Sequence, residues 1–79
     1  MKIRLRDIDN RGDDGAPYEF TAEPEKVIGY LDGPLRRDLR DPEVAWLGEA
    51  IAKVRSGDID GANALLNPNA AVYLTTSIK

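Results

Sequence analysis

Apolar and polar residues alternate in three stretches of the chain, residues 2–8, 17–22 and 71–78. Alternation with a period of two is typical of a β-strand that buries one face. Residues 9–16, which separate the first two stretches, are rich in glycine and aspartate, and these residues favour turns. The pattern therefore predicts an N-terminal hairpin with a long acidic tip and a third strand near the C-terminal end.

After the second strand the apolar residues follow a helical spacing. Pro24 favours the start of a helix, because the N–H that proline lacks would have no partner in the first turn. Gly33 and Pro34 are expected to end this helix, since both residues disfavour its continuation. Residues 35–40 are expected to add a short turn.

Two further helices are predicted before the last strand. Residues 41–43, Asp-Pro-Glu, combine a capping carboxylate, a first-turn proline and an acid that the helix dipole favours. Gly57 is expected to end that helix just after Ser56. Asp58 is expected to cap the next helix, which residues 67–69, Asn-Pro-Asn, would break. The buried face of the longer helix is expected to comprise Val44, Leu47, Ile51 and Val54.

The order strand, strand, two to three helices, strand predicts a single α+β domain over residues 1–79. We expect a three-stranded, antiparallel-type sheet, made of the N-terminal hairpin and the C-terminal strand, with the first strand central. The helices would pack on one face of this sheet. The strand side chains expected to face them are Ile3, Leu5, Val72, Leu74 and Ile78.

The composition restricts the chemistry that the chain can perform. It contains no cysteine and no histidine, which excludes disulfides, the common zinc sites and imidazole acid–base catalysis. Residues 7–12 resemble the start of a calcium loop, but Arg11 and Tyr18 occupy positions that require oxygen ligands. We therefore expect no metal and no cofactor.

Enzymatic activity is not expected either. No serine, threonine or lysine has an evident base beside it, and no glycine-rich phosphate loop follows a predicted strand. The first residues alternate charged and apolar side chains, so they predict neither a signal peptide nor a membrane anchor. Together with the excess of arginine over lysine, this favours a cytoplasmic protein of a bacterium or of a phage-infected host.

The net charge of −3 is distributed unevenly along the chain. Residues 7–25 hold seven carboxylates against Arg11, a net charge of −6, and such a cluster favours a protein partner with a basic surface. Trp46 and Tyr30 flank the apolar stripes of their helices, so we expect them to act as apolar anchors. The acidic residues of the predicted partner-binding site are Asp7, Asp9, Asp13, Asp14, Glu19, Glu23 and Glu25.

The polar face of the predicted sheet offers an alternative site. It would present Lys2, Arg4 and Arg6 beside Tyr73, and basic and aromatic residues on an open sheet can bind nucleic acid. Ordinary cross-strand pairing between arginine and glutamate would produce the same pattern. The net negative charge disfavours direct nucleic-acid binding, and self-association stays open.

Taken together, the short length, the hairpin of residues 2–22, the acidic stretch and the capped helix of residues 41–56 resemble type I anti-CRISPR proteins. These are small inhibitors from phages and mobile elements. The resemblance implies a non-enzymatic inhibitor that blocks DNA binding or nuclease recruitment by a type I CRISPR surveillance complex. That group shares no signature motif, so the resemblance assigns no functional residue. Toxin-immunity proteins and antitoxins have similar size and acidity and stay open as alternatives.

Overall fold

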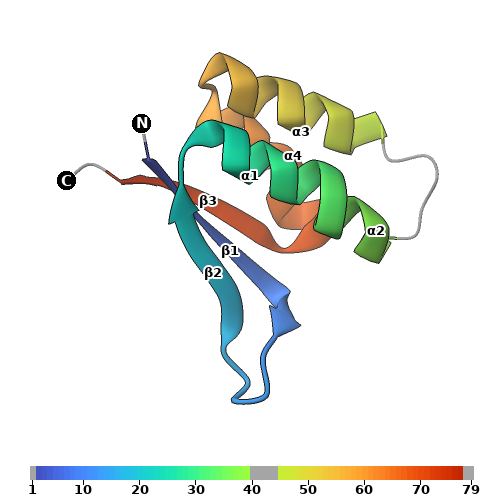
Figure 1. The fold of residues 1–79 in the computed structure, drawn as a ribbon. Coiled ribbons are helices and arrows are strands. Elements are labelled where there is room, and N and C mark those ends of the chain that lie inside the picture. The colour runs from blue at the N-terminus through green and yellow to red at the C-terminus, as the bar shows by residue number, and fades with distance from the viewer. Residues whose placement is uncertain (1, 40–44, 78–79) are drawn as a thin grey trace.

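The computed structural model describes residues 2–39 and 45–77. Three antiparallel strands form one sheet in the order β2-β1-β3, and the helices cover one face of it (Figure 1). The α+β class and the central first strand are therefore confirmed. The elements in chain order are β1 (Lys2–Arg11), β2 (Pro17–Ala22), α1 (Pro24–Tyr30), the π-helix η1 (Leu31–Leu35), α2 (Arg36–Leu39), α3 (Ala45–Ser56), α4 (Ile59–Ala70) and β3 (Val72–Ser77).

The core lies between the sheet and the helices. In β1, Ile3 and Leu5 are completely buried, and Leu5 is paired with Phe20 on one side and Leu74 on the other. Successive strand side chains alternate between the two faces, so this register sends the charged residues of β1 to the open face. The helices contribute further fully buried side chains, which include Val27, Leu31, Leu47, Ala62 and Leu66.

The predicted stop at Gly33 and Pro34 is wrong, because the chain continues from α1 through η1 into α2. Pro34 cannot donate the usual backbone hydrogen bond, and the wider π-turn accommodates it. Leu31 and Leu35, on either side of the proline, are both buried. Burial of these two side chains stabilises the helical conformation, although Gly33 and Pro34 locally disfavour it.

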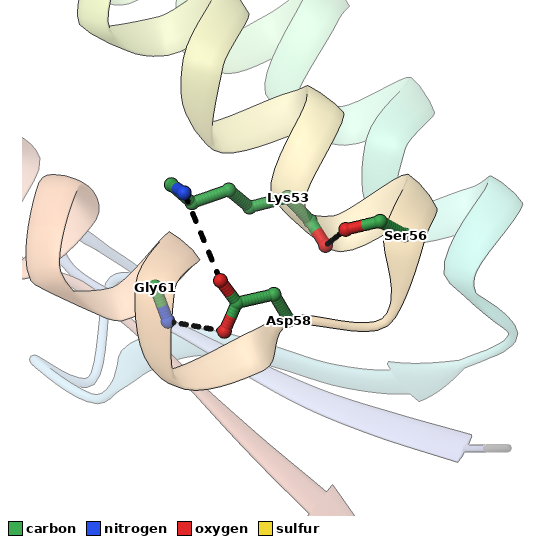
Figure 2. Close-up of polar contacts among 4 residues, drawn as sticks. All are labelled: Lys53, Ser56, Asp58 and Gly61. Carbon is green, nitrogen blue, oxygen red and sulfur yellow. Dashed lines mark hydrogen bonds and ion pairs between the residues drawn. The ribbon is translucent and has the colours of Figure 1, made fainter.

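The junction between α3 and α4 follows the prediction. Gly57 has a φ of 88°, in the left-handed region that glycine adopts without strain, and α3 ends there. The Asp58 carboxylate then caps α4 by accepting a 2.9 Å hydrogen bond from the backbone N–H of Gly61 (Figure 2). Lys53 on α3 lies 3.7 Å from the same carboxylate, so the cap also joins the two helices.

Two predictions for the helical region concern residues outside the described chain: the start signal at residues 41–43, and Val44. Within α3, the predicted buried residues Leu47, Ile51 and Val54 are indeed buried. The expected inward position of Ile78 also falls outside the described residues, whereas Val72 and Leu74 face the core as predicted.

The predicted break at Pro68 is wrong, because α4 continues to Ala70. Pro68 cannot donate the backbone hydrogen bond that the carbonyl of Ala64 would otherwise accept. Pro68 and Ala64 are both exposed, so water can bind that carbonyl instead. The Asn69 side chain donates to the carbonyl of Leu65 at 2.7 Å and supports the last turn. The helix ends instead at Ala71, which adopts a φ of 52°.

Replacing Gly61 by alanine is expected to disrupt this cap, and the same replacement at Gly48 is the matched control. A Cβ at Gly61 would collide with the Asp58 carboxylate, whereas a Cβ at Gly48 would meet no atom within 4 Å. Gly61→Ala should therefore lower the free energy of unfolding by about 1–2 kcal/mol through loss of the cap. Gly48→Ala should raise it by about 0.5–1 kcal/mol, because alanine is the better helix former. Urea denaturation measures both changes, and stabilisation by both substitutions would contradict the assigned cap.

Candidate partner-binding site

One of the seven predicted acids lies inside the fold. Asp7 is 3% exposed, because it shares the helix-facing side of β1 with Ile3 and Leu5. The Tyr30 hydroxyl donates a 2.6 Å hydrogen bond to the Asp7 carboxylate and accepts one of 3.2 Å from the Asn10 amide. A buried carboxylate requires such donors, since its desolvation is otherwise costly.

The prediction that Tyr30 flanks the apolar stripe of its helix and acts as an anchor for a partner is wrong, because the structure buries this residue. The side chain is 8% exposed and belongs to the core. Its ring stacks on Tyr18 with a centroid distance of 5.4 Å and meets Phe20 edge-on at 5.7 Å. Tyr18 is 44% exposed, so Tyr18 is the accessible aromatic residue at this end of the molecule.

Two further acids are paired with the basic residues of the sheet. Glu19 lies 2.8 Å from the Arg6 guanidinium, and Glu23 lies 3.3 Å from the Lys2 ammonium. All four side chains are about half exposed, so each pair stabilises the fold by at most about 1 kcal/mol. These pairs nevertheless neutralise part of the charge that the sequence assigned to the acidic segment. Glu25 is exposed in the first turn of α1, where the helix dipole favours an acid.

The remaining acids are exposed: Asp13 and Asp14 lie in the turn that joins β1 to β2, and Asp9 lies near the end of β1 that leads into it. This end of the hairpin projects beyond the helices (Figure 1). Asp14 accepts a 3.0 Å hydrogen bond from the N–H of Ala16, which shapes the turn. We call Asp9, Asp13, Asp14 and their neighbour Tyr18 the hairpin end.

Arg11 does not neutralise the hairpin end. Its guanidinium donates to the carbonyl of Gly15 at 2.9 Å, and within the described chain it forms no ion pair with a carboxylate. Asp14 and Tyr18 line a hollow of about 360 Å³ on the hairpin. The hairpin end therefore combines unneutralised carboxylates with an accessible aromatic ring.

Trp46 is not part of this site. The side chain is half-buried and packs against the core from α3. In Figure 1, α3 lies at the opposite end of the molecule from the turn of the hairpin. The structure thus places Tyr18 beside Asp14 at the hairpin end and leaves Trp46 apart from it. The sequence contained a signal for Tyr18, because an aromatic residue beside a long turn has few neighbours to cover it.

The alternative, basic site has the predicted arrangement. The register pairs Arg4 with Thr21 and Thr75, and Arg6 with Glu19 and Tyr73, on the face that the helices do not cover. Tyr73 is 44% exposed. Within the part of the chain that the structure describes, Arg4 forms no ion pair, whereas Lys2 and Arg6 each face a glutamate.

Comparison of the chain with protein-family models, with curated proteins and with solved structures finds no match. None of the helices in the described ranges is both long and apolar enough to cross a membrane. Over the same residues, no group of three or more acidic side chains is arranged to hold a metal ion. The independence from metals and cofactors stays a prediction.

The Asp7–Tyr30 contact makes a prediction about stability. Tyr30→Phe keeps the ring in its cluster but removes the hydroxyl that Asp7 accepts from. We expect the free energy of unfolding to fall by about 1–3 kcal/mol, because the buried carboxylate loses a donor. The matched control, Tyr73→Phe, changes an exposed hydroxyl on the open face and should have an effect below about 0.5 kcal/mol. Equal effects in chemical denaturation would show that the contact contributes nothing.

Proposed function

We propose that this chain is a non-enzymatic inhibitor that binds a basic surface of a nucleic-acid-handling protein complex through its hairpin end. The observation that carries the proposal is the presence of three exposed carboxylates at the projecting end of the hairpin, Asp13 and Asp14 in the turn and Asp9 near the end of β1, with which Arg11 forms no ion pair. Clustered like charges repel each other, and a basic partner relieves that repulsion. A surface that normally holds a phosphate backbone has the complementary charge.

The hairpin end also meets the second requirement of a protein interface. Exposed charges mainly raise the association rate, whereas affinity depends on a desolvated aromatic or apolar anchor. Tyr18 is half exposed and is held rigidly by its contacts with Phe20 and Tyr30. A rigid ring loses little conformational entropy on binding. The hairpin end would therefore present one oriented anchor surrounded by carboxylates.

The more specific proposal is that the partner is a type I CRISPR surveillance complex and that the protein acts as an anti-CRISPR. The small size, the acidic hairpin and the absence of recognisable catalytic residues from the sequence support this reading, which rests on resemblance of type. A toxin or a toxin-like nuclease with a basic active-site surface is the competing partner. Both partners are nucleic-acid-handling proteins, so the same surface chemistry serves either.

The acidic hairpin end can be tested by reversing two charges. Asp9→Lys with Asp13→Lys spares Asp14, whose carboxylate shapes the turn. We expect the association rate with a purified type I surveillance complex to fall by about tenfold or more at low salt, and its salt dependence to weaken. Biolayer interferometry across a salt series measures both quantities. Circular dichroism checks that the variant is folded.

The matched control reverses two exposed acids on the helices, Glu49 and Asp60, to lysine, which changes the net charge by the same amount. A general effect of net charge would slow both variants equally, whereas a local interface slows only the hairpin variant. Full binding by the folded hairpin variant would exclude the hairpin end as the interface. Binding to a toxin in place of the surveillance complex would reassign the partner but keep the surface.

A second candidate function is favoured by two residues on the open face of the sheet. Arg4 has no ion-pair partner among the residues that the structure describes, and Tyr73 has an exposed ring. We expect binding of short RNA or DNA to be weak at about 100 mM salt, since the net charge is −3. A mobility-shift assay tests this expectation. Tight, salt-sensitive binding that Arg4→Gln and Tyr73→Ala abolish would favour a nucleic-acid-binding module over the inhibitor.

A further inference from the structure

The two edges of the sheet differ in how their backbone groups are satisfied. On the outer edge of β3, Asn63 of α4 binds both backbone groups of Leu74: its amide donates to the carbonyl, and its oxygen accepts from the N–H, each at 2.8 Å. Asn67 donates to the carbonyl of Val72 at 2.7 Å. The asparagine side chains thus take the place of a neighbouring strand along this edge.

No residue of the described ranges covers the outer edge of β2 in this way. Because the N–H and carbonyl of Leu74 face α4, the pair Leu5–Leu74 exchanges no backbone hydrogen bonds. Antiparallel pairs alternate, so Leu5 directs its backbone groups toward Phe20 of β2. The backbone groups of Glu19 and Thr21 must then point away from β1. Within the described chain no strand pairs with β2 on that side.

A groove accompanies the open edge. It has a volume of about 580 Å³ and lies between β2 and α1, where Tyr18, Phe20 and Tyr30 provide an apolar lining and Thr21 marks the strand edge. Three charged side chains also line it. Lys2 and Glu23 form an ion pair with each other, whereas Lys26 of α1 forms no ion pair within the described residues. Considering only residues 2–39 and 45–77, the groove therefore offers backbone groups without a strand partner, an apolar wall and a lysine without an ion pair.

We propose that the groove binds an extended segment of a partner protein, which adds to the sheet as a fourth strand beside β2. Main-chain hydrogen bonds to Glu19 and Thr21 would supply affinity, and pockets for alternate side chains would supply selectivity. On the helix side of such a strand, an apolar side chain meets the aromatic lining, and an acidic side chain two residues away meets Lys26. The segment that fits is therefore an extended peptide with an apolar and an acidic residue at alternate positions.

A second copy of this chain fits the groove less well than such a peptide. It would have to offer β2 itself, whose Phe20 is already packed against Tyr30. It would also bring together two chains that each carry a net charge of −3. The groove is separate from the exposed acids of the proposed inhibitory surface and shares only Tyr18 with them. Failure of one proposal therefore leaves the other standing.

The direct test is an NMR titration of the labelled protein with a capped peptide of six residues, the length of β2, in which leucine and glutamate alternate with threonines. We expect the backbone amides of Glu19 and Thr21 to shift and to become protected from solvent exchange. A control peptide whose backbone nitrogens are methylated keeps the side chains but cannot pair as a strand. It should bind at least about tenfold more weakly, because strand addition depends on the main chain.

Substitutions at Thr21 and Lys26 test whether the peptide pairs with the edge of β2 and whether its acidic side chain contacts Lys26. Thr21→Pro removes only an outward N–H, which an edge strand tolerates, whereas Thr21→Val keeps that N–H. Peptide affinity should fall by about tenfold or more for the proline variant and stay within about twofold for the valine variant. Lys26→Glu should weaken binding of the glutamate peptide and strengthen binding of a lysine analogue, since the charge pair is reversed.

Three results would overturn the proposal. The first is the absence of amide shifts in β2 at millimolar peptide. The second is equal binding of the methylated peptide, which would show that the groove accepts side chains without strand pairing. The third is a dimer in light scattering that Thr21→Pro dissociates and the peptide does not displace, which would make a second copy the occupant.

Discussion

The two-sided pairing of β1 is the constraint on which the rest of the structure depends. Because β2 and β3 both pair with it, the register of β1 decides which side chains of all three strands face the helices. Ile3 and Leu5 are completely buried, so a shift by one residue would place Arg4 and Arg6 in the core. The same register directs Asp7 inward to Tyr30 and forms the basic open face. The register of β1 therefore decides which charged residues are buried and which lie on the open face.

Much of this arrangement was predictable because strands with one buried face alternate strictly. That pattern identified the sheet, its central strand and the basic face. It also contained a signal for Asp7, which has the same parity as Ile3 and Leu5, although the acidic surroundings favoured an exposed position. The helix stops at Pro34 and Pro68 were wrong for different reasons. The stop at Pro34 is overridden by tertiary packing that buries Leu35, and the stop at Pro68 by an exposed carbonyl that water can reach and by the Asn69 side chain, which donates to the carbonyl of Leu65.

The candidate site was predictable only in part. Counting charges along the sequence could not reveal that Glu19 and Glu23 pair with Arg6 and Lys2, because those contacts require the strand register. For Tyr30, a position beside an apolar stripe did not distinguish a surface anchor from a core residue with a polar partner. Three of the seven acids lie exposed at the hairpin end, and the structure places Asp14 and Tyr18 in the lining of one hollow. These three, Asp9, Asp13 and Asp14, form no ion pair with another described residue, and Asp14 accepts the turn hydrogen bond from Ala16.

The asparagine cover on β3 has a consequence for the ways in which copies of this chain can assemble. A sheet with two accessible edges can join head to tail, and each addition leaves a fresh edge, so the chain of molecules grows without limit. Here Asn63 and Asn67 close one edge along Val72 and Leu74. Association through β2 then gives a closed assembly. A peptide or a second molecule that pairs with β2 occupies the accessible edge, so no further molecule can add there. Because two asparagine side chains of α4 cover the β3 edge, the chain can bind a partner strand at β2 without polymerising into fibres.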